Sequence, residues 1–234
     1  MTLVLAESAL EPIPEQLWKY SAVQKYAKQR RKHPRFIVLD RSYHHSAMKT
    51  LTLNEKRGRP DIVHFALLEA LGSPLNREGL LQTHVHTVSD YVIWVNPETR
   101  LPRNYDRFVS LMEQLFEYGQ IPPEGDEKQL LTLKKQTLTQ LMDEIKPSCT
   151  LALSRIGRPE TLEATVSKLT GEKKPVVLVG GFPHGHFSES TTKLADEVVC
   201  IDWEMLEAWT VVSRVIYEHE RTLSLPKKRL TGKE

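Results

Sequence analysis

Residues 176–188 read Val-Val-Leu-Val-Gly-Gly-Phe-Pro-His-Gly-His-Phe-Ser. Four apolar residues followed directly by two glycines predict a buried parallel strand that ends in a tight turn. Gly180, Gly181 and Gly185 remove Cβ atoms from this turn, which permits positive φ and close approach to a ligand. Because ligands of open α/β sheets bind beyond the carboxyl ends of strands, the loop is a candidate site. A plain connection that uses glycine only for turning explains the pattern equally well at this point.

The composition is that of a globular protein with an almost balanced charge. The chain has 234 residues, of which 40% are hydrophobic and 26% charged, and its formal net charge is +2. This length can form one large α/β domain with a full core. Because the net charge is small, affinity for nucleic acid would require a local basic patch.

Cysteine use and hydropathy bear on the compartment. Cys149 and Cys200 provide neither a disulfide framework nor the spacing of a zinc site, which favours a reducing cytosol. The first residues lack the pattern of a signal peptide, and no apolar run is long enough to span a bilayer. We therefore expect a cytoplasmic protein that makes no membrane contact.

Strands and helices are expected to alternate along the chain. Apolar runs predict strands over residues 2–6, 36–40, 80–88, 91–95, 149–153, 176–179 and 198–201. Helical spacing predicts helices over residues 15–30, 60–71, 102–116, 127–144, 161–170 and 204–220. Polar loops are expected over 41–57 and 121–126. The alternation predicts an α/β fold with a mainly parallel sheet and helices on both faces, elaborated by a β-hairpin and a helix.

One predicted helix opens with a charged pair. Pro60 suits the first helical position and Asp61 follows it, an arrangement typical of helix starts, which would hold Arg59 and Asp61 at the mouth of the helix. An aspartate that only complements the helix dipole, beside a solvated arginine, is the more common explanation of such a pair.

A second predicted helix opens with three arginines. It is expected to begin near residues 102–103, which places Arg103 and Arg107 one turn apart and Arg100 just before them. Arginine at a helix start works against the dipole, so helix stability does not explain the cluster. A bound polyanion does explain it.

Three separated segments resemble one known family. Residues 59–64, residues 95–108 and the loop 180–188 together resemble the Nep/Emg family of ribosome-biogenesis methyltransferases, of the SPOUT or α/β-knot superfamily. The resemblance runs from about residue 2 to residue 222. It implies a single SPOUT-like methyltransferase domain over 1–234 with an inserted RNA-binding elaboration around 72–125. It also implies a trefoil knot in the C-terminal half, a rare exception among folds.

The resemblance also implies an activity. Members of the family methylate N1 of a pseudouridine in small-subunit ribosomal RNA with S-adenosyl-L-methionine, act as homodimers and serve ribosome biogenesis. The fixed geometry of Arg59 and Asp61 at the helix mouth makes them our hypothesis for the catalytic residues: Asp61 would help through Arg59 to remove the N1 proton, with Asp40 a second candidate. The methyl donor would be held by Gly180, Gly185, Ile201, Asp202, Trp203, Glu204, Met205 and Leu206. The RNA would be held by Arg59, Arg100, Arg103 and Arg107.

One segment departs from the family pattern. Many relatives carry Ser-Asn-Tyr-Pro-Leu-Ser where residues 202–207 read Asp-Trp-Glu-Met-Leu-Glu. This difference leaves open the side-chain roles of Asp202 and Glu204. It also leaves open an alternative function, an RNA-binding ribosome assembly factor with little or no methyl transfer.

Paired histidines invite a metal-site interpretation. His44 and His45 are adjacent, and H-x-H pairs occur at residues 84–86 and 184–186. Two imidazoles on one face of a strand suit zinc, but no nearby cysteine or carboxylate completes a ligand pattern. We therefore expect no metal.

Overall fold

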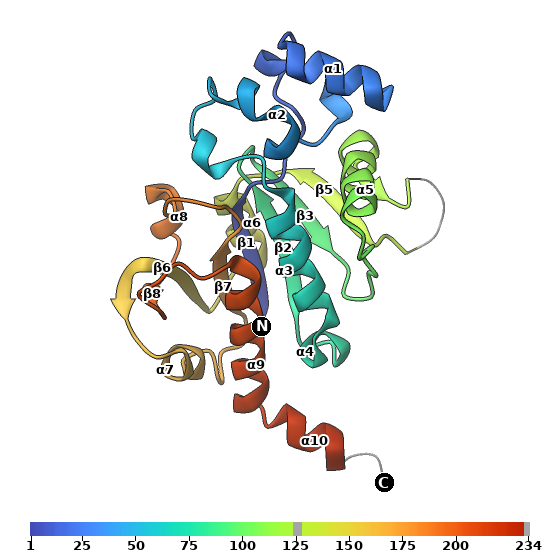
Figure 1. Cartoon of the computed structure of the whole chain (residues 1–234). Coiled ribbons are helices and arrows are strands. Elements are labelled where there is room, and N and C mark those ends of the chain that lie inside the picture. Colours follow the sequence, from blue (N-terminus) through green and yellow to red (C-terminus); the bar gives the residue numbers. More distant parts are fainter. Residues whose placement is uncertain (124–127, 232–234) are drawn as a thin grey trace.

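The computed structural model describes residues 1–123 and 128–231. Over these residues the chain forms one sheet with the strand order β4-β5-β3-β2-β1-β7-β6-β8 (Figure 1). The strands are β1 (Thr2–Ser8), β2 (Gln82–Thr87), β3 (Tyr91–Val95), β4 (Gln120–Ile121), β5 (Leu131–Lys135), β6 (Cys149–Pro159), β7 (Pro175–Gly180) and β8 (Glu197–Cys200). The pairs between neighbours from β2 to β8 are parallel, and β3, β5 and β4 continue the sheet in antiparallel pairs. The mainly parallel sheet is therefore confirmed.

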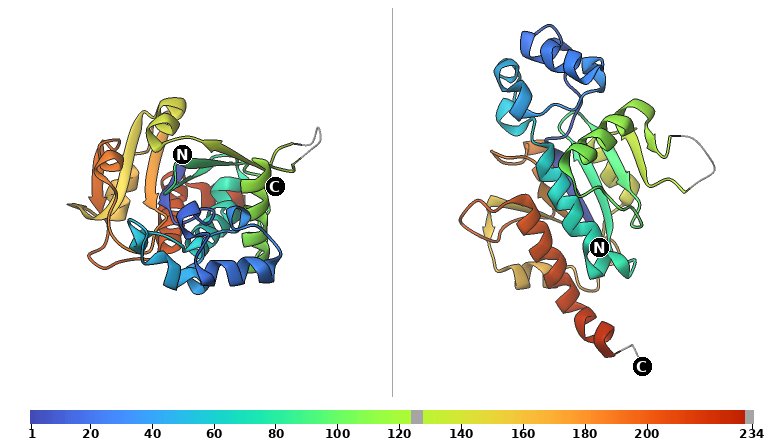
Figure 2. Two further views of the ribbon diagram at one scale, coloured as in Figure 1. Left: turned by 90° about the horizontal axis from the view of Figure 1, so that it is seen from above. Right: turned by 45° about the vertical axis from the view of Figure 1, so that its right-hand side comes forward.

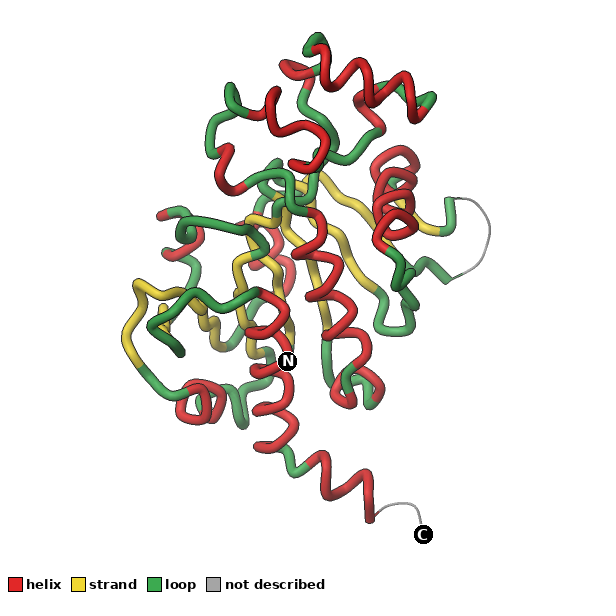
Figure 3. The backbone as a smooth tube through the Cα atoms, in the orientation of Figure 1, coloured by secondary structure: helices red, strands yellow, loops and turns green. Residues whose placement is uncertain are grey.

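Helices cover both faces of this sheet (Figure 3). Along β1, Leu3 and Leu5 belong to the core formed with α3, α5 and α9, whereas Val4 and Ala6 belong to the core formed with α6. This division follows from the pleat, which points successive side chains to opposite faces. The helices are α1 (Ser21–Arg30), α2 (Arg41–Met48), α3 (Pro60–Gly72), α4 (Pro74–Arg77), α5 (Tyr105–Tyr118), α6 (Leu138–Ile145), α7 (Leu162–Ser167), α8 (Glu189–Thr192), α9 (Ala208–Thr222) and α10 (Leu225–Thr231).

The helices α1 and α2 form an N-terminal helical unit, residues 10–58, at the end of the molecule opposite α10 (Figures 1 and 2). Three short 3₁₀ helices complete the unit: η1 (Glu15–Leu17), η2 (Pro34–Phe36) and η3 (Asn54–Lys56). The unit has its own small core, which includes Leu17, Val23, Leu39 and Met48. No helix in the described ranges is both long and apolar enough to cross a membrane.

Two predictions in this unit were wrong. Residues 36–40 make no strand of the sheet, only a single antiparallel bridge between Pro12 and Val38. Ile37 and Leu39 enter the small core and Val38 enters the main core, and periodicity alone cannot distinguish such a buried segment from a strand. The predicted loop 41–57 begins as α2, because the carboxylate of Asp40 accepts a hydrogen bond from the Ser42 amide at 2.8 Å and caps the helix. The predicted helix 15–30 divides into η1 and α1.

The predicted helix 127–144 was also wrong. Residues 131–135 form β5, in which Leu131 and Leu133 pair with β3. The helix begins only after Thr137, where a capping box with Gln140 starts α6. Residues 124–127, which include part of the predicted loop 121–126, lie outside the described residues.

Strand β6 bends around β8. Val199 of β8 is paired with Leu153 and also with Arg158, both of which belong to β6. At the bend, a Cβ on Gly157 would lie 2.6 Å from the carbonyl of Val198, so only glycine allows β6 and β8 to approach each other this closely. We expect the implied trefoil knot in this crossing region.

Candidate functional site

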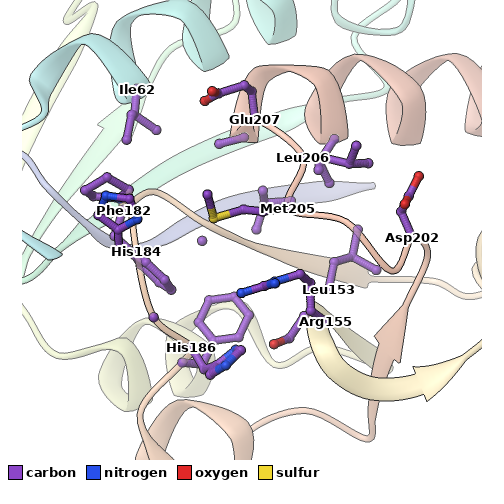
Figure 4. A pocket seen from close by; sticks show the side chains of 18 of the residues that line it. Ile62, Leu153, Arg155, Phe182, His184, His186, Asp202, Met205, Leu206 and Glu207 are labelled. Atoms are coloured by element: carbon purple, nitrogen blue, oxygen red, sulfur yellow. The ribbon is translucent and has the colours of Figure 1, made fainter. Parts of the chain in front are cut away.

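A pocket lies at the carboxyl ends of β7 and β8 and against the middle of β6 (Figure 4). Its lining comes from three segments: residues 153–155 within β6, the end of β7 with the loop that follows it (179–187), and the segment after β8 (201–211). Arg59 and Ile62, from the start of α3, complete the wall. Because parallel strands end at the same edge of a sheet, the loops after β7 and β8 meet there, and ligands of α/β sheets bind at this edge.

The glycines of the loop after β7 have different tasks. A Cβ at Gly181 would lie 2.1 Å from the Ser8 hydroxyl, so Gly181 allows the loop to pass tightly over the end of β1. Gly185 has φ of +94°, which L side chains rarely adopt. Gly180 and Gly185 line the pocket, whereas Gly181 does not. Packing therefore explains Gly181, and pocket shape explains the other two.

A buried ion pair between Glu7 and Lys56 anchors the loop after β7. The carboxylate of Glu7 accepts hydrogen bonds from the Lys56 ammonium and from the Ser188 amide, each at 2.7 Å. The Lys56 ammonium also donates to the carbonyl of His186 and lies 4.4 Å from the centre of the Phe182 ring. Glu7 and Lys56 are both buried. The pair therefore connects β1 and η3 to both ends of the pocket loop.

The ion pair sets the charge state of Glu7. Burial by itself would raise the pKa of the Glu7 carboxyl, but the hydrogen bonds from Lys56 and Ser188 outweigh burial and lower the pKa. The carboxyl is therefore ionised at neutral pH. Sequence reasoning missed this pair, because its members are 49 positions apart and no local pattern connects them.

Arg59 and Asp61 form a bidentate ion pair at the mouth of α3. Arg59 Nε donates to Oδ1 of Asp61 at 2.8 Å and a terminal guanidinium nitrogen donates to Oδ2 at 2.7 Å. These hydrogen bonds raise the pKa of Arg59. Arg59 lines the pocket and Asp61 does not, so the aspartate orients the arginine without facing the cavity.

Asp40 has a structural environment. It is buried, caps α2 and accepts a hydrogen bond from the Tyr105 hydroxyl. Burial, together with the Asp40 carboxylate, raises the pKa of Tyr105. Asp40 thus joins the N-terminal helical unit to the start of α5 and is outside the pocket.

The three arginines lie near the start of α5, but not as predicted. The helix begins at Tyr105 because Asn104 Oδ1 accepts a hydrogen bond from the Arg107 amide at 3.1 Å. Arg107 is therefore in the first turn, whereas Arg103 precedes the cap. All three arginines are exposed and none lines the pocket. The carbonyl of Pro102 is 2.7 Å from Nε2 of His64, which places the start of α5 beside α3.

The segment after β8 contributes most of its predicted donor-binding residues to the pocket wall. Ile201, Asp202, Glu204, Met205 and Leu206 line the cavity. Trp203 does not, and it is 75% exposed. The predicted helix 204–220 begins only at Ala208, so these residues form an extended turn.

Asp202 shapes this turn. Its Oδ1 accepts a hydrogen bond from the Glu204 amide at 3.0 Å, and its Oδ2 lies 3.8 Å from a guanidinium nitrogen of Arg214 on α9. Asp202 is thus occupied by its own segment, an arrangement common where aspartate begins a turn.

Sequence reasoning missed two charged residues of the pocket. Arg155 lies within β6, just after the predicted strand 149–153, and Glu207 precedes α9; both line the cavity. Figure 4 places Glu207 beside Ile62 on one side and Arg155 near His186 on the other. No ion pair or hydrogen bond of the Glu207 carboxylate is present among residues 1–123 and 128–231. The position of Arg155 directly after the predicted strand 149–153 was a signal that could have found it.

Comparison with known proteins decides the family. Residues 3–220 match the family model for "EMG1/NEP1 methyltransferase". The chain belongs to this family. It is 46% identical over 218 residues to the ribosomal RNA small subunit methyltransferase Nep1 of Pyrococcus furiosus, a match that covers 93% of this chain and 95% of that one. It is 44% identical to the Nep1 of Staphylothermus marinus over 96% of this chain and 97% of that one.

A solved structure from the EMG1/NEP1 family has the same fold. The crystal structure of Archaeoglobus fulgidus Nep1 bound to S-adenosylhomocysteine superposes with a TM-score of 0.84 at 39% identity, and the match covers 95% of this chain and 98% of that one. This chain is therefore a methyltransferase of the EMG1/NEP1 family, and its fold matches the A. fulgidus structure over almost its whole length.

The histidines of the pair 84–86 make contacts within this EMG1/NEP1 member. His84 packs edge-on against Trp94 with ring centres 4.4 Å apart, and burial lowers its pKa to about 4. Nδ1 of His86 accepts a hydrogen bond from the Glu7 amide. Within the described ranges, no three His, Cys, Asp or Glu residues are grouped closely enough to hold a metal ion.

Proposed function

We propose that this chain transfers the methyl group of S-adenosyl-L-methionine to small-subunit ribosomal RNA. Its relatives carry the name of that activity, and the Nep1 of A. fulgidus is bound to S-adenosylhomocysteine, the demethylated donor. The observation that carries the proposal is the pocket where β6 meets the loops after β7 and β8, lined by Gly180 and Gly185.

The residues of this pocket fit such a donor. Gly185 at positive φ and Gly180 leave backbone unshielded by side chains, where a ligand can approach closely. Apolar side chains of Ile62, Leu153 and Leu206 offer contact to a nucleoside. The nearby carboxylates of Asp202, Glu204 and Glu207 complement a positively charged sulfonium. We assign donor binding to Gly180, Gly185, Ile201, Asp202, Glu204, Met205 and Leu206, with Trp203 outside the wall.

The donor, when bound, supplies an electrophilic methyl group on its sulfonium, and the protein must orient the acceptor and exclude water. We propose N1 of a pseudouridine as the acceptor, because only the isomerised base has a free ring nitrogen there. Arg59 reaches the pocket and carries a fixed positive charge. It would stabilise negative charge that develops on the ring, as donors of an oxyanion hole do.

The N1 proton needs an acceptor. Both oxygens of Asp61 are bound to Arg59, which suits Asp61 to positioning this arginine. Glu207 lines the same wall, and it favours the charged form of Arg59, whose pKa it helps to raise. We propose Glu207 as the proton acceptor, because a base must be within reach of the proton and free to accept it.

The target base must leave its stack to enter a pocket in a protein loop, which favours a single-stranded or hairpin-loop substrate. We propose that Arg100, Arg103 and Arg107 hold phosphates beside this base. The three side chains are exposed at the start of α5, which His64 and Asp40 join to the start of α3. Each guanidinium can bind phosphate in a bidentate way. The segment around 72–125 would thus be the RNA-binding elaboration of a single domain.

We propose a homodimer in the cytoplasm. Phe65 of α3 packs edge-on against Trp209 of α9 and is 43% exposed. Trp203, Met205 and Tyr217 are more than half exposed near the same helix. Exposed apolar residues gathered beside a functional pocket are typical of an interaction surface, and a second copy would cover them. The free thiols Cys149 and Cys200 suit a reducing compartment.

The proposal is tested by methyl transfer to two matched RNA hairpins. One carries pseudouridine and the other uridine at the same loop position, and labelled S-adenosyl-L-methionine is the donor. We expect transfer to the pseudouridine hairpin alone. Transfer to both would contradict the choice of N1. Tight binding of both without transfer would instead support an RNA-binding assembly factor.

A further inference from the structure

The N-terminal helical unit carries an uncompensated run of positive charge. Residues 16–39 contain no aspartate or glutamate, although the whole chain has a net charge of only +2. The same stretch contains seven cationic residues: Lys19, Lys25, Lys28, Arg30, Arg31, Lys32 and Arg35. Such a concentration on one small unit is a local basic patch, the feature that nucleic-acid binding requires of a nearly neutral protein.

Two of these cations have a structural task. Arg30 and Lys32 bind the carboxylate of Glu113 at 3.0 and 2.7 Å. Glu113 is a buried residue of α5, so the two ion pairs attach α1 to this helix. The other five cations are exposed and have no ion-pair partner in the part of the chain that the structure describes.

Helix stability explains only part of the remaining charge. Cations near the end of α1 complement its dipole, which accounts for Lys28. Lys25 is in the middle of the helix, and Lys28 follows it at i+3, a spacing at which like charges repel. The repulsion is a local cost that a bound polyanion would remove.

Three of the five unpaired cations line a groove together with aromatic rings. Lys25, Lys28 and Arg31 are among its lining residues, as are Trp18 and His33. The two rings meet edge to face with centres 4.8 Å apart, and Trp18 Nε1 donates a hydrogen bond to the Ile13 carbonyl at 2.8 Å. The indole is therefore fixed. Cations beside fixed rings are the combination that binds single-stranded nucleic acid, through phosphates and stacked bases.

The groove neighbours the arginines of α5. Arg30 is close enough to Asp106 and Glu113 for both carboxylates to favour its charged form, and their effect raises its pKa although burial opposes it. Asp106 directly precedes Arg107. The views in Figures 1 and 2 both place α1 beside α5. The basic stretch of α1 and the arginines at the start of α5 therefore belong to neighbouring helices.

We propose that this groove, lined by Trp18, Lys25, Lys28, Arg31 and His33, binds an unpaired segment of the RNA next to the methylated hairpin. The inference rests on the proposed function, because it extends the substrate that the pocket acts on. An acidic protein segment would use the cations alone. Unpaired nucleotides would contact both the cations and the aromatic rings of the groove. The neighbouring arginines of α5 are assigned to RNA as well, so RNA is the ligand that we propose.

The test measures affinity for three RNAs: the minimal hairpin, the hairpin with a single-stranded extension, and the hairpin with a duplex extension of equal length. The variant is Lys25→Glu/Lys28→Glu. The control is Lys227→Glu/Lys228→Glu, because these lysines are also adjacent on a helix, exposed and free of ion pairs among the described residues.

We expect the wild type and the control to bind the single-stranded extension more tightly than the minimal hairpin. The groove variant should lose this gain, about tenfold, and its salt slope should fall by about 0.7 for each phosphate contact removed. Equal affinity of the wild type for the minimal and extended hairpins would overturn the proposal, as would an equal loss in the control. A gain only with the duplex extension, or displacement of RNA by polyglutamate as effectively as by RNA, would assign the groove to another ligand.

The groove and the methyl-transfer proposal can fail separately. The groove variant should transfer methyl to saturating minimal hairpin at the wild-type rate and unfold at the wild-type temperature, which excludes a folding defect. Absence of transfer in the wild type would contradict the proposed reaction, whatever the affinities of the three RNAs.

Discussion

The pocket and the arginine surface use charge in opposite ways. Against the pocket loop, Lys56 of η3 and Glu7 of β1 are buried and bound to each other, so each charge has a fixed position. At the start of α5, Arg100, Arg103 and Arg107 are exposed to solvent. Removing one member of a buried pair leaves an uncompensated charge, whereas a solvated charge can be lost with little effect on folding. The comparison therefore separates residues that shape the donor site from residues that attract RNA.

The largest expected effect is the loss of Lys56. In Lys56→Met the Glu7 carboxylate stays buried without its partner, which should lower the free energy of unfolding by about 3 kcal/mol, the cost typical of broken buried pairs. Donor affinity should fall as well, because the pocket loop loses its attachment. Chemical denaturation and calorimetric titration with S-adenosylhomocysteine measure the two effects. The double variant Glu7→Gln/Lys56→Met should recover part of the stability. If Lys56→Met were as stable as the wild type, the buried ion pair would matter no more to folding than the exposed arginines do.

The next effect concerns the proposed proton acceptor. Glu207→Gln keeps the shape of the side chain but cannot accept a proton, so single-turnover methyl transfer should slow by about 10²-fold, the lower range for general bases. RNA affinity should stay unchanged. The control is Glu204→Gln, a carboxylate of the same wall. An equal loss in both variants would assign Glu207 to donor binding rather than to proton transfer.

Asp61→Asn tests positioning. The amide can keep only part of the bidentate contact, so Arg59 should lose its orientation and turnover at saturating RNA should fall by about tenfold or more, as small misplacements do. Asp143→Asn, an exposed aspartate of α6, is the matched control. If Asp61→Asn kept full turnover, Asp61 would only complement the dipole of α3 and would not position Arg59 for the reaction.

A smaller effect is expected on the exposed surface. Arg103→Ala should weaken RNA binding by about threefold to tenfold and reduce the salt slope by about 0.7, the value for one phosphate contact on a single strand. Unfolding should be unchanged. Titrations at several salt concentrations measure the slope, and an unchanged slope would argue against phosphate contact at Arg103.

The smallest effect is a pH dependence of stability. Because the pKa of Glu7 is lowered on folding, its contribution is present above the unfolded carboxyl pKa of about 4.3 and is lost as pH falls through the lower folded value. The difference in unfolding free energy between wild type and Glu7→Gln should therefore be constant near neutral pH and shrink below about pH 4. A constant difference down to pH 3 would contradict an ionised Glu7.

The sequence by itself determined the elements with strong local signals. The valine run and glycines of 176–188 correctly predicted β7 and its loop, and Pro60 correctly predicted the start of α3. The alternation over 80–95 predicted the β2–β3 hairpin. Each of these signals depends on the backbone preferences and the apolar periodicity of residues that are close in sequence. It can therefore be recognised without knowledge of the rest of the chain.

Only the tertiary structure decided which distant residues meet. The apolar run 36–40 became part of a small helical core instead of a strand, and 131–135 became β5 because β3 offered it an edge. Glu7 and Lys56 paired, and Arg155 and Glu207 entered the pocket, because parallel strands bring their ends to one edge of the sheet. Long-range contacts depend on strand order and on burial, which local sequence does not encode.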